Sequence, residues 1–225
     1  MCRMLLANRE GIFRLCKTLQ DLPGAFSLES YLTNLELRDG GDGNGYALFR
    51  NGALLELHKG VALSCATIAS AMLEREYDWV LFHSREASEG SVTDANCHPF
   101  HVPGTPDLIA AVNGNEASLS RLARAAGNIT DSEFILRAVS RMKLPLFPAL
   151  CTFESNFFGF YGRYPFVKKG NRDMLIWKEK EGIVFASDFP FGMSNLVKPP
   201  QNYCWCNGKD GLLPPESSLS EKGAS

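Results

Sequence analysis

The second residue of the chain is a cysteine, and this position gives it two reactive groups. Methionine aminopeptidase removes an initiator methionine when the next residue is small, so loss of Met1 would leave a thiol and a free α-amine on Cys2. Such an amine titrates near ~8 and can accept the thiol proton at neutral pH, and a thiol pKa of about 8.5 needs only a modest shift. Cys2 is therefore a candidate nucleophile that carries its own base. Taken alone, a cysteine at this position is more often an ordinary thiol, so the rest of the chain must decide.

Two further segments carry groups that could bind an amino-acid substrate. HSREASEG, residues 83–90, follows an apolar run, and its Arg85 could clamp a carboxylate through a bidentate pair. TDSE, residues 130–133, contains Asp131, which could bind an ammonium group. Each segment also has a simpler interpretation, because arginine after a strand is usually a surface residue and Asp131 could cap a helix. The capping role and the binding role of Asp131 are compatible.

Another pair of segments completes the set. In AVNGNE, residues 111–116, Asn113 and Gly114 could present a side-chain amide and a backbone N–H together as an oxyanion hole. Loss of one such donor costs about 3 to 4 kcal/mol of transition-state stabilisation. In isolation the dipeptide is at least as typical of a plain Asn-Gly turn. The last segment is NCHPF, residues 96–100.

The cysteines indicate neither a disulfide framework nor a strong metal site. There are seven, an odd number without regular spacing, which suits a reducing compartment and predicts mostly buried free thiols. Cys204 and Cys206, taken with Cys97, His98 and His101, suggest zinc, but C-x-C without a second matching pair is a weak metal signal. We expect no metal and no organic cofactor.

Length and composition are typical of one large soluble domain of 225 residues, 45% of them hydrophobic and 21% charged. The net charge of -2 gives no general attraction to nucleic acid or to anionic lipid. No run approaches the ~18 to 20 apolar residues of a membrane span, and the N-terminal segment lacks a signal-peptide core, so we expect a cytoplasmic protein. The polar composition of residues 214–225 predicts a mobile tail after a domain at 2–213.

Hydrophobic periodicity predicts the elements that must position these residues. The chain alternates helix-periodic and strand-periodic runs, and Asn51-Gly52 is a strong hairpin signal. Helices are predicted at about 10–22, 61–76, 117–126 and 131–142, and strands at 3–8, 44–49, 53–58, 78–84, 108–112, 157–161, 174–178 and 183–187. Strands at both ends of the chain with helices between them favour an α+β fold of two antiparallel sheets flanked by helices. A parallel doubly wound sheet is not favoured. GDGNG, residues 41–45, lacks a following phosphate-binding lysine and is interpreted as a turn or a substrate-side loop.

Taken in order, MCR, HSREASEG, NCHPF, VNGN and TDSE make the chain resemble the class II glutamine amidotransferases, the N-terminal-nucleophile family. The match spans residues 2 to about 140, with looser agreement in the strands to about 195. The N-terminal Cys and the H-x-R-x-A-S-x-G block are specific in combination. The chain is most similar to stand-alone members beginning MCR, among them the ergothioneine-pathway γ-glutamyl hydrolase. The resemblance implies a four-layer αββα sandwich.

The resemblance also assigns roles to residues. Cys2 matches the nucleophile, with its own α-amine as general base. Arg85 matches the arginine that holds the substrate α-carboxylate, and Ser88 matches a neighbouring member of that clamp. The remaining matches are an oxyanion-hole pair and an acid that holds the α-ammonium: Asn113, Gly114 and Asp131.

Three positions depart from the family pattern. Val112 stands where histidine usually precedes Asn-Gly, and we expect altered packing more than lost chemistry, since the next two residues supply the oxyanion donors. Glu86 replaces a frequent aromatic, and Glu89 stands where some members carry histidine. Two extra carboxylates beside Arg85 would weaken its hold on an anionic substrate or select a different amide.

The residues themselves agree with this chemistry, because glutamine presents a carboxylate, an ammonium and a terminal amide that Arg85, Asp131 and Cys2 would address one each. Attack by the thiolate would give a γ-glutamyl thioester with loss of ammonia or an amine, and water would complete the hydrolysis. We therefore expect an amidohydrolase for glutamine or a γ-glutamyl amide. Two alternatives stay open: a glutaminase subunit that passes ammonia to a separate synthetase, and a catalytically silent binding domain.

Overall fold

The computed structural model describes residues 2–88, 90–127, 129–142 and 144–207. Within them the strands form two sheets, and every strand pairing is antiparallel. The larger sheet has the order β11 (Leu196–Val197), β9 (Leu175–Glu179), β10 (Gly182–Ala186), β1 (Arg3–Asn8), β4 (Trp79–Ser84), β2 (Asn44–Arg50) and β3 (Ala53–Gly60). The smaller sheet has the order β12 (Cys204–Cys206), β8 (Tyr164–Lys168), β7 (Asn156–Tyr161), β6 (Leu108–Asn113) and β5 (Phe100–Val102).

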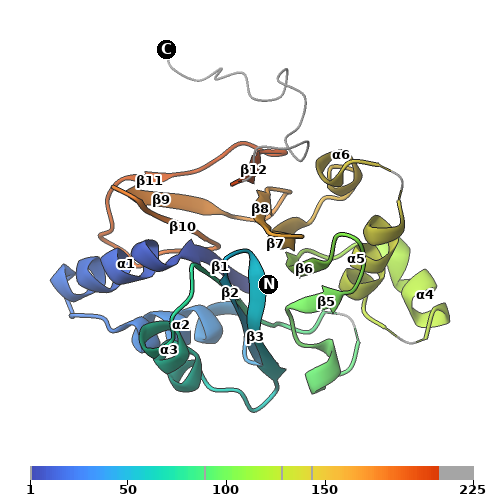
Figure 1. Cartoon of the computed structure of the whole chain (residues 1–225). Coiled ribbons are helices and arrows are strands. Elements are labelled where there is room, and N and C mark those ends of the chain that lie inside the picture. The colour runs from blue at the N-terminus through green and yellow to red at the C-terminus, as the bar shows by residue number, and fades with distance from the viewer. Residues whose placement is uncertain (1, 89, 128, 143, 208–225) are drawn as a thin grey trace.

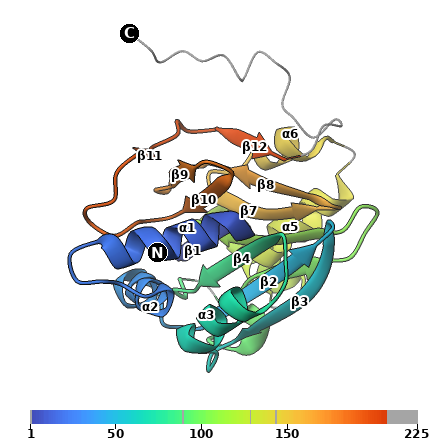
Figure 2. The same ribbon diagram turned by 60° about the vertical axis from the view of Figure 1, so that its left-hand side comes forward.

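Helices cover the outer face of each sheet (Figures 1 and 2). On the larger sheet lie α1 (Arg9–Asp21), α2 (Leu28–Asp39) and α3 (Cys65–Glu74). On the smaller sheet lie α5 (Asp131–Arg141) and α6 (Leu146–Leu150), and α4 (Ala117–Ala125) packs beside α5. A short 3-10 helix, η1 (Asp94–Asn96), lies near β3.

Three separate apolar clusters define the layers. One joins α1, α2 and α3 to the larger sheet and includes Leu15, Leu32 and Phe82. Another joins α5 and α6 to the smaller sheet. The third lies between the sheets, where Phe49 and Phe160 stack with ring centroids 3.5 Å apart. Since neighbouring residues of a strand point to opposite faces, each sheet buries both of its faces. The predicted αββα sandwich of two antiparallel sheets is confirmed.

Local sequence explains most of the element boundaries. Asn51 and Gly52 have φ values of 53° and 75°, so the hairpin between β2 and β3 adopts the left-handed backbone that this dipeptide favours. The helix predicted at 61–76 is shorter, because the Ser64 side chain accepts a hydrogen bond from Thr67 N–H and caps it there. The sequence analysis missed β5, β8, β11, β12, α2 and α6. The predicted tail at 214–225, and with it the end of the domain at 213, lies outside the described residues.

None of the helices in the described ranges combines the length and the apolar character needed to cross a bilayer.

Candidate functional site

Cys2 directly precedes β1, which runs in the middle of the larger sheet. Its neighbour Arg3 is in register with Ser84, so Cys2 faces the segment that leaves β4. The Glu86 N–H donates to Cys2 Sγ at 3.4 Å, and the thiol donates to Glu86 O at 3.5 Å. The backbone after β4 therefore holds the thiol in a defined place.

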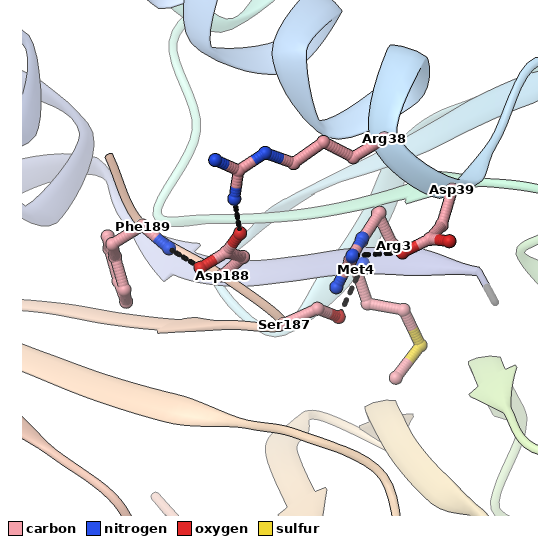
Figure 3. Close-up of polar contacts among 7 residues, drawn as sticks. All are labelled: Arg3, Met4, Arg38, Asp39, Ser187, Asp188 and Phe189. Carbon is pink, nitrogen blue, oxygen red and sulfur yellow. Dashed lines mark hydrogen bonds and ion pairs between the residues drawn. The ribbon is translucent and has the colours of Figure 1, made fainter. Parts of the chain in front are cut away.

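The strand that carries Cys2 is itself fixed at its first two residues (Figure 3). Arg3 forms an ion pair with Asp39 at the end of α2. Met4 N–H donates to Ser187 Oγ at 3.0 Å, and Ser187 N–H donates to Met4 O at 3.0 Å. Both contacts tie the start of β1 to distant parts of the chain and limit the movement of Cys2.

The thiol of Cys2 is protonated in this environment. Removal from water raises its pKa to about 11, Arg85 opposes the rise, and the carboxylates of Asp131 and Asp42 add to it. Because the thiolate is the reactive form, a cysteine with this pKa needs an adjacent base to act as a nucleophile at neutral pH.

Arg85 is buried directly after β4, with only 3% of its surface exposed. Its backbone N–H donates to Gly43 O at 2.8 Å, and its carbonyl accepts from Asp42 N–H at 3.0 Å. The side chain donates from Nη1 to Ser91 O at 3.0 Å. These contacts hold the guanidinium inside the site, so the interpretation of Arg85 as a surface residue is wrong. They also give the glycine-rich 41–45 segment a role as a support for Arg85.

Asn113 ends β6, and Gly114 follows it. A Cβ added to Gly114 would lie 2.1 Å from Ser155 Oγ and 2.8 Å from Ser155 Cα, so no larger residue fits there. Neither residue is among those with positive φ. Close packing therefore explains the glycine, and the plain Asn-Gly turn does not.

A hydrogen-bonded chain runs from Asp131 through Glu116 to Ser155, the residue against which Gly114 packs. Asp131 Oδ2 accepts from Glu116 N–H at 2.9 Å, and Glu116 Oε1 accepts from Ser155 N–H at 3.0 Å and from Ser155 Oγ at 2.8 Å. Asp131 Oδ1 accepts from Ser132 N–H at 2.8 Å. Thr130 is the helix N-cap, because its Oγ1 accepts from Glu133 N–H at 3.1 Å. Asp131 is thus the first residue of α5 and not its N-cap, and its carboxylate is held by backbone donors.

Two adjoining cavities contain the six predicted residues. The Arg85 cavity, about 20 Å³, is lined among others by Arg85 and Asp131. The Arg172 cavity, about 120 Å³, is lined among others by Asn113, Asn115 and Arg172. Both share four lining residues: Cys2, Glu86, Ser88 and Gly114. The structure therefore brings together all of the predicted site residues, with Cys2 at the junction of the cavities.

A larger cavity of about 440 Å³ lies beside α2 and contains none of the predicted site residues. Arg38 forms an ion pair with Asp188 at its edge, and Asp188 Oδ1 accepts from Phe189 N–H at 2.9 Å (Figure 3). Its walls carry aromatic side chains, and its lining residues include no cysteine, serine or threonine.

Sequence reasoning considered His98 only within a weak zinc signal, and the structure places it against the Arg85 cavity. Its Nδ1 accepts from Val112 N–H at 3.3 Å, and its ring lies 4.1 Å from that of His83. Burial lowers the pKa of His83 to about 3 and that of His98 well below its usual range, so both rings are neutral near pH 7. Val112 is the residue that departs from the pattern described in the sequence analysis, and its backbone N–H contacts His98 at this position.

Other residues missed from the sequence are Glu116, Ser155, Asn115 and Arg172. Glu116 and Asn115 stand beside the Asn-Gly motif, but Ser155 and Arg172 come from the chain on either side of β7 and β8 and carry no local signal. Glu89 lies outside the described residues. In the ranges that the structure describes, no group of three or more His, Cys, Asp or Glu side chains could hold a metal ion.

Comparisons with known proteins agree with this fold. No protein-family model and no curated protein matches the sequence. Among solved structures, the allosteric regulatory enzyme of purine biosynthesis is similar, with 18% identity and a TM-score of 0.60 over 83% of this chain. Glutamine phosphoribosylpyrophosphate amidotransferase from B. subtilis, complexed with ADP and GMP, gives 18% identity and a TM-score of 0.57 over 83% of this chain. The chain spans 42% of the length of each of these two proteins. A predicted glutamine amidotransferase from Pseudomonas aeruginosa gives 15% identity and a TM-score of 0.46, covering 92% of this chain and 93% of that one.

The first two of these neighbours share the α+β fold of two antiparallel sheets between helical layers. At such low identity the similarity is one of fold.

Proposed function

We propose that the protein is an N-terminal cysteine amidohydrolase that cleaves glutamine or a γ-glutamyl amide through a γ-glutamyl thioester. The observation that carries the proposal is the place of Cys2, at the junction of the Arg85 cavity and the Arg172 cavity. A carboxylate partner, an ammonium partner and an oxyanion-binding pair surround one thiol.

Substrate recognition uses the Arg85 cavity. Arg85 forms a bidentate pair with the substrate α-carboxylate, and Asp131 accepts from the α-ammonium. Ser88, which lines both cavities, completes the clamp. Held at this end, the γ-carbonyl carbon of the substrate lies at Cys2 Sγ, and its oxygen lies toward Asn113 and Gly114.

Acylation begins with proton transfer. Removal of Met1 gives Cys2 an α-amine, which accepts the thiol proton as the sulfur attacks. The thiolate forms a bond to the γ-carbon, and the carbonyl oxygen becomes an oxyanion that accepts from Asn113 Nδ2 and Gly114 N–H. Collapse breaks the C–N bond, and the departing nitrogen takes the proton from the α-ammonium of Cys2.

Hydrolysis of the thioester restores the enzyme. The free α-amine takes a proton from water as its oxygen attacks the thioester carbon, and the same donors hold the second oxyanion. The C–S bond then breaks, glutamate leaves and the thiol regains its proton. No step uses a metal ion or an organic cofactor.

The Arg172 cavity is the larger of the two and has room for the amide end of the substrate. A single water needs roughly 10 to 15 Å³ of comparable space, whereas this cavity measures about 120 Å³ and the Arg85 cavity about 20 Å³. With the substrate α-carboxylate at Arg85, the γ-carbonyl and the leaving amine lie toward the Arg172 cavity. Arg172 places a positive charge there, which suits an amine that carries an acidic group. Transfer of ammonia to a separate synthetase is the second candidate reaction.

Intact mass before and after treatment with a diazo-ketone analogue of glutamine tests the proposal. We expect loss of Met1 and one adduct, mapped to Cys2, and no adduct in a Cys2→Ala variant. Cys16, a half-buried thiol on α1, is the internal control and stays unmodified.

Retention of Met1 with no adduct would support the silent binding domain instead. Loss of Met1 with no adduct would indicate that free glutamine is a poor fit, and a panel of γ-glutamyl amides would then separate the hydrolase from the ammonia-transferring subunit.

A further inference from the structure

We propose that Cys151 and Cys204 are a site of reversible disulfide formation, separate from the nucleophile Cys2. Their sulfur atoms lie 3.8 Å apart, although the residues are 53 positions apart in the chain. Both are free thiols in the structure. A disulfide brings two sulfurs to about 2.05 Å, so the two side chains must rotate toward each other to close the remaining distance.

The two thiols differ in access. Cys151 is exposed at the C-terminus of α6, where its N–H donates to Phe147 O at 2.8 Å. Cys204 is 5% exposed, on β12 at the edge of the smaller sheet, and belongs to the apolar cluster under α5 and α6. An oxidant in solution therefore reacts first with Cys151, because Cys204 is shielded from solvent.

A buried cation lies beside the pair. Lys168 is in register with Cys204 and is fully buried, and its Nζ donates to Phe153 O and to Ser155 O. Its charge acts on both thiols and opposes the rise in the pKa of Cys204 that burial causes. A fixed positive charge stabilises the thiolate that forms in each exchange step.

A small disulfide of the glutathione type supplies the oxidising equivalents. The Cys151 thiolate attacks one sulfur of that disulfide, forming a mixed disulfide and releasing one thiolate, which takes up the proton that Cys151 lost. The sulfur of Cys204 then attacks Cys151 Sγ, its proton passes to the second departing thiolate, and the intramolecular bond forms. The two protein thiols are oxidised by two electrons, and the small disulfide is reduced to two thiols.

The position of the pair connects it to the rest of the molecule. Cys151 begins the segment that ends at Ser155, and Ser155 packs against Gly114 and is bonded to Glu116. A bond from Cys151 to Cys204 ties the start of this segment to β12. Oxidation therefore restrains the loop that supports Gly114, whatever reaction the protein performs.

The test is incubation of the full chain with oxidised glutathione, followed by alkylation under denaturing conditions and peptide mapping. We expect two fewer alkylated thiols and a linked pair of peptides containing Cys151 and Cys204, reversed by dithiothreitol. Cys206, two residues further along β12, is the matched control: Cys206→Ser keeps the link, and Cys204→Ser loses it. Cys151→Ser, a change at an exposed position, loses it as well and does not disturb the core.

A stable glutathione adduct on Cys151 without the internal link would overturn the proposal, as would a link from Cys151 to Cys206 or unchanged alkylation of Cys151 and Cys204. These outcomes do not depend on turnover, so they are distinct from a failure of the proposed amidohydrolase function.

Discussion

The Arg85 cavity and the Arg172 cavity share Cys2 but differ in size and in the way their charged residues are held. The first measures about 20 Å³, and its arginine is 3% exposed at the end of a central strand. The second measures about 120 Å³, and its arginine is half-buried in the loop between β8 and β9. From this contrast we expect strict recognition of the substrate in the Arg85 cavity and acceptance of different amines in the Arg172 cavity.

Physical chemistry gives a reason for this division. Arg85 is held by its backbone bond to Gly43 and by the bond from its guanidinium to Ser91 O, and a guanidinium fixed in this way favours a substrate that offers a carboxylate in bidentate geometry. A more exposed arginine in an open space is screened by water and contributes less. Substrates of the proposed enzyme should therefore share the γ-glutamyl group and vary in the amine.

The largest expected effect comes from the residue common to both cavities. Cys2→Ala should lower turnover of any γ-glutamyl amide by at least about 10³-fold, because it removes the atom that forms the thioester. Steady-state kinetics measures the loss, and circular dichroism checks the fold. Cys16→Ala is the control and should retain activity. Full activity in Cys2→Ala would contradict the mechanism outright.

A smaller loss is expected from the oxyanion pair. Asn113→Ala should lower kcat by about 10²-fold or more with little change in KM, since its amide is proposed to bind charge that develops only in the transition state. Asn115→Ala changes another asparagine lining the Arg172 cavity and is the matched control. Equal losses in both variants would remove the special role given to Asn113.

A direct comparison of the two arginines sharpens the contrast between the cavities. Arg85→Lys keeps the charge but loses the bidentate fork, so kcat/KM should fall about 10 to 100-fold for every substrate, chiefly through KM. Arg172→Ala should cost about tenfold or less, and only for amides whose amine carries an acidic group. Kinetics on glutamine and on γ-glutamyl amides of neutral and acidic amines measures both. A uniform loss in Arg172→Ala would contradict the division of roles.

The sequence predicted the elements that have strong local signals. The hairpin at Asn51-Gly52 and the helix capped by Thr130 were predictable because their backbone conformations depend on side chains within a few residues. By contrast β8 contains Pro165 and ends on the buried Lys168, whose ammonium donates to the carbonyls of Phe153 and Ser155. Such a strand has no apolar alternation to reveal it. The helix α2 did have apolar residues at helical spacing after Ser27, so that signal was overlooked.

For the site, motifs indicated the residue types but not the packing that supports them. Asn113 and Gly114 stood out as a dipeptide, yet the reason for the glycine is contact with Ser155, which is far away in the chain. Arg172 has no motif at all, and it reaches the site only because β7 and β8 fold back beside β6. Contacts of this kind depend on the three-dimensional arrangement of the two sheets.

The smallest expected effect concerns the buried histidines beneath the Arg85 cavity. The pKa of His83 is lowered to about 3 and that of His98 lies well below 6.5, so the unfolded chain binds more protons than the folded one below pH 6.5. Their contribution to stability is complete above pH 6.5 and is lost progressively as the pH falls toward the folded pKa values. Between pH 6.5 and 5, each histidine should lower the free energy of unfolding by up to about 1.4 kcal/mol per pH unit.

Urea denaturation at a series of pH values measures this slope. His83→Leu should reduce the slope by about one proton, even if it also changes the absolute stability. An unchanged slope in His83→Leu would show that His83 is protonated in the folded protein. A second cation would then lie near Arg85, and recognition of the substrate carboxylate would no longer rest on Arg85 alone.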